Sequence, residues 1–529
     1  MDSKAEYDVL IVGYGMLGNV AALLLAHWGM RVVVVEKKKA PDVLLTKSAR
    51  IDDEVLLILE QLGLEKEIRQ ILHPLQGTQV IDKKERVLLE FNEEKNGDSA
   101  PLYGFYQPDL QQLLQKEATK HRNITIFDAC EVENFEQGGE KVEVFVSRKG
   151  VTAFQNITVS YLLVCNGQHS RIADFLDIEV EDFNYESAVL CVDTVCKNEK
   201  VAAQRYAQTI YDADLPVVRI TNNNRHQRWE FQIGNEQIAA ATTPEKVRSL
   251  LTEFSSLDLD VTSAFVYEFE ARMLTNWVVK RVLIAGDAAH IMPPYLGMGL
   301  AAGIKDVYNL VWKLKLVHEK VCAANLLETY QLERAANVRY LIQLNLWIKR
   351  LFKSSKLRWI RGFVPVIPKW FLKRQLSTQN TLKSGIVGKH SKGAGKLMRS
   401  PKVGTQKGEV LSLNQALQTE FVVLALGQNP VDALQPNQVE FLAGLRAQFI
   451  HLTPAKQKFV QDGRYAQNLY DKEGKVQAWL QQHKAQFVII RPDRMVYDFC
   501  SNIAALNQAV WNLEQQLPMR QLAYDDVVF

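Results

Sequence analysis

Three glycines near the N-terminus have the spacing of a nucleotide-binding turn. They form a G-x-G-x-x-G pattern that follows the apolar run 7–12 and precedes a stretch of helical composition at 19–28. The first glycine allows a tight turn, the second lets the backbone approach a pyrophosphate, and the third lets helix and strand pack closely. N–H groups at the helix start then face the phosphates. The alternative is a glycine-rich turn kept for packing. We expect dinucleotide contacts from Gly13, Gly15, Met16, Leu17 and Gly18.

An acidic residue closes the second strand of this βαβ pattern. The β-branched run 32–35 ends at Glu36, with Lys37 directly after it. A carboxylate at this position accepts hydrogen bonds from an adenosine ribose and disfavours a 2′-phosphate. Glu36 and Lys37 are therefore predicted to lie at the nucleotide, which is FAD or NAD rather than NADP.

A second carboxylate favours FAD over NAD. Asp287 stands after the apolar run 282–285, and a glycine-rich helix start with Gly297 and Gly299 follows. A carboxylate at a strand end can bind a ribityl hydroxyl, and a helix start directs N–H groups toward whatever lies before it. An isoalloxazine ring there would have the negative charge at its N1–C2=O edge stabilised by those groups.

Both motifs resemble those of the FAD-dependent aromatic-ring hydroxylases, the class A flavoprotein monooxygenases with the para-hydroxybenzoate hydroxylase fold. The resemblance covers nearly the whole chain and is greatest to the branch of 3-(3-hydroxyphenyl)propionate, phenol and polyketide hydroxylases. It implies that segments 47–54, 106–110 and 131–132 approach the flavin. The further cofactor contacts that it implies are Arg50, Gln107, Val132, Asn166, Gly167, Asp287, Pro294, Gly297, Gly299 and Leu300.

The resemblance also implies a reaction. The chain holds one dinucleotide fingerprint, so NAD(P)H would bind transiently as co-substrate, deliver hydride to flavin N5 and leave. Reduced flavin would then capture O₂ as a C4a-hydroperoxide, which transfers one oxygen atom to a phenolic or polyketide-like aromatic ring. The protein's task would be to exclude water and orient the acceptor carbon. The expected activity is that of an FAD-dependent monooxygenase.

Two departures from the family pattern concern the reductant. The family's Asp-Gly motif is replaced at 165–173 by a version with Asn166 in place of the aspartate and Ala173 in place of the terminal arginine. Since this motif serves both FAD and NAD(P)H in the family, NADH, NADPH or neither remains open. Met298 also replaces the family's usual glutamine, which should alter the shape of the pocket more than FAD retention.

Substrate-pocket candidates come from an alternating strand and a proline loop. Trp229 and Phe231 alternate with polar residues and could form a dry wall, with core packing as the alternative. Pro293, Pro294 and Tyr295 form the loop, whose backbone carbonyl could accept a hydrogen bond from a phenol. His290 is interpreted as a structural partner of its loop, and no catalytic acid or base is assigned.

Two other classes of function stay open. Asn166 and Ala173 fit a flavin oxidase, dehydrogenase or drug- or antibiotic-modifying monooxygenase with altered or absent NAD(P)H use. A binding protein that retains FAD would instead use the basic segment 349–375 and the C-terminal domain for a partner. A solvated helical connector is the favoured interpretation of that basic segment, ahead of a membrane-surface role.

The length of 529 residues corresponds to about three domains. We predict an α/β protein in which a Rossmann-type FAD-binding domain is interleaved with a mostly antiparallel substrate-binding sheet. The FAD-binding segments are 1–75, 106–185 and 271–350, and the sheet takes 76–105 and 186–270. A basic helical connector follows at 351–410. The last domain, 411–529, resembles a thioredoxin-like module without Cys-x-x-Cys and so implies no disulfide chemistry.

Composition narrows the remaining classes. A net charge of +3 argues against a general nucleic-acid-binding protein. The six cysteines show neither Cys-x-x-Cys nor zinc-ligand spacing, so we expect buried thiols in a reducing compartment and no metal site. No apolar run reaches the roughly eighteen residues of a membrane span, and the acidic start is unlike a signal peptide. We expect a cytoplasmic protein, and a homodimer is left open.

Overall fold

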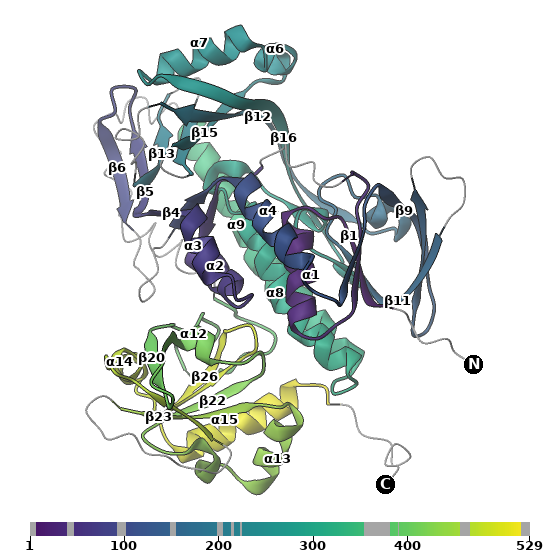
Figure 1. Ribbon diagram of the computed structural model, residues 1–529, viewed down its shortest axis with the longest axis vertical. Coiled ribbons are helices and arrows are strands. Elements are labelled where there is room, and N and C mark those ends of the chain that lie inside the picture. Colours follow the sequence, from purple (N-terminus) through teal and green to yellow (C-terminus); the bar gives the residue numbers. More distant parts are fainter. Residues whose placement is uncertain are drawn as a thin grey trace. The chain divides into compact units, whose positions relative to one another are not determined.

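The computed structural model describes residues 7–39, 47–92, 102–148, 155–197, 205–212, 216–222, 225–353, 381–389, 391–454 and 466–519. The chain divides into two compact units (Figure 1). The first takes nearly all of residues 1–307 together with 338–379, and the second takes 308–337 and 380–529. Most of the basic segment 349–375 lies outside the described residues.

A parallel sheet forms the base of the first unit. β1 (Tyr7–Val12) pairs in parallel with β2 (Val32–Val35) and β11 (Gln155–Val164), and β8 (Ile124–Phe127) and β18 (Val282–Ile284) extend the sheet on its two sides. The four valines of β2 are buried, as expected of a parallel strand covered on both faces. Three further strands join this sheet through antiparallel pairs, namely β9 (Cys130–Gln137), β10 (Val142–Arg148) and β17 (Val278–Val279).

Helices connect these strands and begin at the same edge of the sheet. α1 (Met16–His27) follows β1 after the glycine turn, and α8 (Gly299–His318) follows β18 after residues 285–298, which include β19 (His290–Ile291) (Figure 1). Because the carboxyl ends of parallel strands meet at one edge, the predicted Gly13 turn and Asp287 loop come together there. The other helices are α2 (Asp53–Glu60), α3 (Glu65–Ile71), α4 (Gln107–Ala118), α5 (Ile172–Phe175) and α9 (Glu328–Lys353).

The predicted antiparallel sheet is the second layer of this unit. Its order is β19-β16-β12-β15-β14-β13-β5-β6, and only the β13–β5 pair is parallel. Helices α6 (Ile238–Ala241) and α7 (Pro244–Phe254) cover one face (Figure 1). The strands are β5 (Gly77–Ile81), β6 (Val87–Asn92), β12 (Val180–Cys196), β13 (Tyr206–Ile210), β14 (Val217–Thr221), β15 (His226–Ile233), β16 (Leu259–Leu274) and β19 (His290–Ile291).

A small three-stranded sheet completes the first unit. It has the order β3-β7-β4 and consists of β3 (Arg50–Asp52), β7 (Leu102–Phe105) and β4 (Leu72–Leu75). The buried Lys305 of α8 forms salt bridges of 2.6 Å to Asp52 and 2.7 Å to Glu54. These ion pairs fix the start of α8 against β3 and α2.

The second unit contains the small α/β domain predicted at the C-terminus. Its sheet has the order β21-β20-β24-β23-β22-β25-β26, with β22 (Val422–Leu426) parallel to β23 (Gln448–Thr453) and antiparallel to β25 (Phe487–Ile490). β20 (Lys402–Thr405) lies within the predicted connector, so the domain begins earlier than residue 411. The remaining elements are β21 (Val410–Ser412), β24 (Ala466–Tyr470), β26 (Val496–Cys500), α12 (Leu413–Ala416), α13 (Pro436–Gly444), α14 (Lys475–Gln482) and α15 (Ile503–Gln516).

The cysteines and the helices bear on two predictions made from composition. All six cysteines are buried free thiols, as predicted. Among the described helices, none combines the length and apolar character needed to cross a lipid bilayer.

Candidate functional site

The glycine turn after β1 is built by close backbone contacts. Gly13 has φ +99°, and a Cβ on it would lie 2.8 Å from the Cα of Asn166. A Cβ on Gly18 would lie 1.9 Å from the carbonyl oxygen of Gly13. Around Gly15, in contrast, a Cβ would meet nothing within 4 Å. The turn therefore packs against β11 and α1 and leaves open space at the first residue before the helix.

This open space belongs to a large cavity of about 830 Å³ at the carboxyl edge of the parallel sheet. The cavity brings together predicted residues that follow β1, β2 and β11 with residues of β9 and of the starts of α1, α4 and α8. The predicted cofactor residues that line it are Gly13, Gly15, Met16, Leu17, Glu36, Lys37, Gln107, Val132, Asn166, Gly167, Asp287, Gly299 and Leu300.

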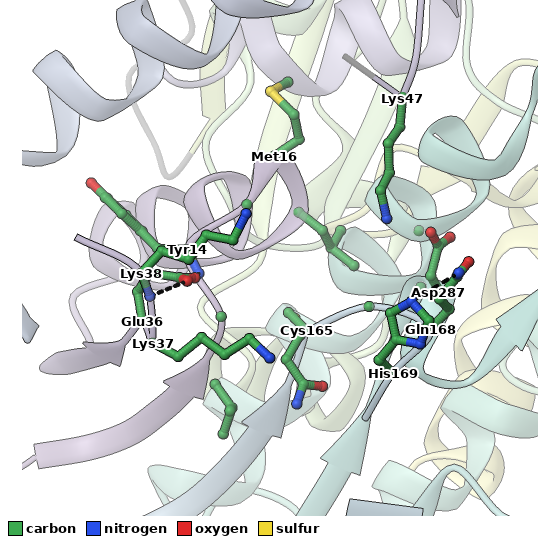
Figure 2. Close-up of a pocket in the computed structure, with 18 of the residues that line it drawn as sticks. Tyr14, Met16, Glu36, Lys37, Lys38, Lys47, Cys165, Gln168, His169 and Asp287 are labelled. Atoms are coloured by element: carbon green, nitrogen blue, oxygen red, sulfur yellow. Dashed lines mark hydrogen bonds between the residues drawn. The ribbon is translucent and has the colours of Figure 1, made fainter. Parts of the chain in front are cut away.

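Glu36 closes one end of the large cavity. Its Oε2 accepts a hydrogen bond of 2.7 Å from the backbone N–H of Tyr14, and its Oε1 accepts one of 2.9 Å from that of Lys38. Figure 2 shows Glu36 beside Tyr14 while Lys37 extends toward Cys165. The carboxylate is thus held at the strand end, next to the glycine turn.

Helix α4 presents a row of glutamines to the cavity. The Oε1 of Gln107 accepts a 2.9 Å hydrogen bond from the backbone N–H of Ser48. Gln111 and Gln115 line the cavity as well, although the sequence interpretation omitted them. Gln107, Gln111 and Gln115 follow one another at intervals of four residues, which places them on the same helix face and could have identified them from the sequence.

The other end of the cavity carries a charged pair. Figure 2 shows Lys47 and Asp287 pointing toward one another. Burial raises the pKa of Asp287, although Lys47 and His290 oppose the shift. The Nζ of Lys47 also lies 4.5 Å from the ring centroid of Tyr267, whose hydroxyl donates a hydrogen bond to Gln168. Lys47 begins the segment 47–54 that the resemblance places at the flavin, whereas the contact predicted from that segment is Arg50.

His290 is a structural residue, as expected. Its Nε2 lies 2.6 Å from the Oδ2 of Asp306 on α8, and both side chains are fully buried. The same Asp306 oxygen accepts a hydrogen bond from the backbone N–H of Gly286. This pairing ties the Asp287 loop to α8 and places His290 outside the residues that line the cavity.

A small cavity of about 70 Å³ adjoins the large one. Arg50, Pro293, Pro294 and Gly297 line this small cavity and not the large one. Gly18 and Tyr295 line neither: Gly18 packs under the turn, and the hydroxyl of Tyr295 accepts a 2.8 Å hydrogen bond from Gln232. Residues common to both cavities are Lys47, Ser48, Tyr267, Asp287, Gly299 and Leu300.

The expectation that Trp229 and Phe231 form a pocket wall is wrong. Both side chains are fully buried in the core between the antiparallel sheet and α7, where Phe231 packs edge-on against Phe254. The reason is the alternation itself, since successive residues of β15 face opposite sides of the sheet. The alternate residue Glu230 lines the small cavity in their place.

A substitution separates these two roles for Trp229. Trp229→Phe should lower the free energy of unfolding by about 1–2 kcal/mol, because a smaller ring leaves unfilled volume in a closed core. Affinity for an aromatic ligand, measured by calorimetric titration, should stay within twofold of wild type. A large loss of affinity at unchanged stability would contradict the core assignment.

The residues around the large cavity fit an FAD molecule. The open space at Gly15 and the N–H groups of α1 suit a pyrophosphate, and Glu36 and Val132 suit the adenosine. Gln107 and Asp287 would hold the ribityl chain, and the start of α8 would face the isoalloxazine.

The comparisons with known proteins agree with this fit. Residues 6–345 match the model of the FAD binding domain family, and residues 395–516 match the HcaD C-terminal domain. Since the first match covers well over half of the chain, the chain belongs to the FAD binding domain family. It is an FAD-dependent flavoprotein of the monooxygenase class.

Individual relatives are similar along nearly the whole chain. The 3-(3-hydroxy-phenyl)propionate/3-hydroxycinnamic acid hydroxylases of Escherichia coli and Shigella sonnei are 26% identical over 511 residues, 92% of this chain and 91% of theirs. The flavin-dependent monooxygenase PieE, solved with FAD and substrate, has a TM-score of 0.77 at 15% identity, over 97% of this chain and 100% of that one. Aklavinone-11 hydroxylase, solved with FAD and aklavinone, has a TM-score of 0.74 at 18% identity, over 97% and 99%.

Proposed function

We propose that this flavoprotein hydroxylates a phenolic or polyketide-like aromatic molecule, using O₂ and a reduced nicotinamide. The observation that carries the proposal is the shared wall of the two cavities, because Asp287, Gly299 and Leu300 line both. A ring in the small cavity would therefore lie beside a flavin held in the large one. The hydroxylases of arylpropionates and of aklavinone among its relatives support an aromatic substrate.

The chain's own residues have defined tasks in this reaction. FAD supplies, when bound, the redox chemistry that couples a reductant to O₂. The glycine turn and the start of α1 would hold the pyrophosphate of FAD. The N–H groups at the start of α8 would stabilise negative charge on the isoalloxazine ring. The apolar lining of the small cavity, which includes Val218, Ile220 and Phe269, excludes water from the reacting ring.

Turnover under labelled oxygen tests the proposal. Purified holoprotein is supplied with NADH or NADPH, ¹⁸O₂ and a panel of phenols and polyketide-like aromatics. We expect substrate-stimulated oxidation of the nicotinamide and a product that carries one labelled oxygen atom. Formation of hydrogen peroxide without a labelled product would identify an oxidase instead. Retained flavin that neither nicotinamide reduces would favour an FAD-retaining binding protein.

A second candidate is an oxidoreductase with altered or absent NAD(P)H use. Asn166 favours it, because this residue is exposed to the large cavity at the position of the family's aspartate. Rapid mixing of the oxidised holoprotein with NADH or NADPH distinguishes the two candidates by the rate at which each nicotinamide reduces the bound flavin. Slow or absent reduction by both nicotinamides would favour the second candidate.

We further propose a cytoplasmic location, which the six buried free thiols support. A homodimer, left open by the sequence, would be recognised by light scattering during size-exclusion chromatography.

A further inference from the structure

The small cavity contains a balanced set of charges. Two cationic side chains, Lys47 and Arg50, and two carboxylates, Glu230 and Asp287, line it. Most of the other lining side chains are apolar, namely Ala49, Val218, Ile220, Phe269, Ile291, Met292, Pro293, Pro294, Met298 and Leu300. The formal charge of the lining is therefore zero, in an environment where an added charge would be poorly solvated.

Arg50 is held in place by the proline-glycine loop. The side chain is buried, and its Nη2 lies 3.5 Å from the carbonyl oxygen of Tyr295. A Cβ on Gly297 would lie 2.6 Å from the Nε of Arg50, so only a glycine leaves room for the guanidinium. Gly297 also has φ +57°, which a side chain rarely adopts. The cation is thus built into the wall of the cavity.

Glu230 faces Arg50 from the antiparallel sheet. Its side chain is 15% exposed, and its Oε1 lies 3.9 Å from the Nη1 of Arg228. Arg228 is itself held by Asp193 through hydrogen bonds of 2.6 Å and 2.9 Å. Burial raises the pKa of Glu230, with Arg228 and Arg50 opposing the shift and Asp193 adding to it. The carboxylate is therefore fixed at the sheet and directed into the small cavity.

We propose that the small cavity selects neutral hydroxyaromatic molecules, in which the aromatic hydroxyl donates a hydrogen bond to Glu230 and a second oxygen accepts one from Arg50. The proposal rests on the proposed function and narrows its substrate class. A carboxylate-bearing substrate would add a negative charge near Glu230, and like charges brought together in such a site are costly. We therefore expect the cavity to prefer an uncharged substituent on the ring to a carboxylate.

Entry of a ring requires the cavity to widen. About 70 Å³ corresponds to roughly two water molecules, less than an aromatic ring needs. Met292 and Met298 flank the space, and unbranched thioether side chains adapt readily to a ligand. Met298 is also the position at which the sequence departs from the family's glutamine, so this departure would adjust pocket shape.

A matched pair of ligands tests the selection by charge. Purified holoprotein is titrated calorimetrically with 3-(3-hydroxyphenyl)propionate and with its primary amide, which has the same shape but no charge. We expect the amide to bind at least tenfold more tightly than the acid. Equal binding, tighter binding of the acid, or no binding of either ligand overturns the proposal.

Glu230→Gln provides the second measurement. Removing one negative charge should narrow the preference for the amide to within about threefold, since the carboxylate of the acid then no longer meets the like charge of Glu230. Glu270→Gln is the control, because Glu270 lies on β16 of the same sheet and is half exposed in a pair with Arg272. An unchanged preference in Glu230→Gln overturns the proposal. Binding is measured without turnover, so a confirmed preference without a hydroxylated product would refute the proposed function alone.

Discussion

Gly18→Ala should weaken FAD binding strongly and destabilise the first unit. Its Cβ would lie 1.9 Å from the carbonyl oxygen of Gly13, a backbone atom that cannot move aside easily. Gly13 is itself confined, because the Cα of Asn166 would lie 2.8 Å from a Cβ at that position. Moving α1 away from the turn should lower the free energy of unfolding by about 3 kcal/mol. At 1.4 kcal/mol per factor of ten, FAD affinity should fall roughly 100-fold or more.

Gly15→Ala distinguishes loss of the cofactor from loss of the fold. Nothing lies within 4 Å of a Cβ on Gly15, so the apoprotein should keep its melting temperature. The same methyl group occupies the space predicted for the pyrophosphate, so the ratio of flavin to protein absorbance should still fall. Gly139→Ala is the control, since its Cβ also meets nothing within 4 Å and Gly139 does not line the cavity. Full flavin content in both Gly15→Ala and Gly18→Ala would contradict the assigned site.

Local sequence predicted the nucleotide end of the site well. Gly13, Glu36 and Asp287 each stand at the end of a short apolar strand, and the carboxyl ends of parallel strands meet at one edge. Their convergence follows from strand order and needs no knowledge of side-chain packing. The structure accordingly brings all three to the large cavity.

The substrate end could not be predicted in the same way. Alternation in β15 separates Trp229 and Phe231 from Glu230, but it does not say which face a helix will cover. That face is decided by α7, which packs Leu250, Leu251 and Phe254 onto the sheet. The apolar residues therefore form core, and the polar residue Glu230 reaches the cavity.

The sequence also could not show which of two cationic side chains in the segment 47–54 lies at the cofactor. Lys47 and Arg50 are three residues apart, and the resemblance assigned the cofactor contact to Arg50. Arg50 begins β3 and is directed beneath the loop of Gly297, whereas Lys47 precedes the strand and lines both cavities. The direction of each side chain depends on pairing between β3 and β7, which spacing along the chain does not reveal.

A buried charge cluster in the second unit was not visible in the sequence at all. Glu333 on α9 accepts hydrogen bonds from Arg491 at 3.0 Å and 2.8 Å, from Lys313 at 2.9 Å and from Asn309 at 2.6 Å. Glu333, Lys313 and Arg491 have no exposed side-chain surface. Partners 20 and 158 residues away satisfy the carboxylate, so no local pattern could identify it.

Glu333→Gln should therefore destabilise the second unit strongly. Removing one partner of a buried ion pair leaves uncompensated charge, here on Lys313, and costs about 3–5 kcal/mol. Arg491 keeps its salt bridge of 2.6 Å to Asp493. Differential scanning calorimetry of the holoprotein should show a lower melting temperature for that unit. Glu440→Gln, at an exposed position on α13, is the control and should stay within about 0.5 kcal/mol of wild type. A melting temperature for Glu333→Gln equal to that of the control would contradict the role of the cluster.

The pH dependence of the same cluster gives an independent measurement. Burial alone would raise the pKa of Glu333, but Arg491 and Lys313 outweigh it and hold the pKa at about 2. The unfolded value is about 4.3, so the folded state favours the ionised form. This stabilisation is fully present above the unfolded pKa and is lost as pH falls toward the folded one. Wild type should therefore lose more stability than Glu333→Gln between pH 5 and pH 3, because glutamine has no proton to bind. Parallel losses in the two proteins would show that Glu333 is not the titrating group.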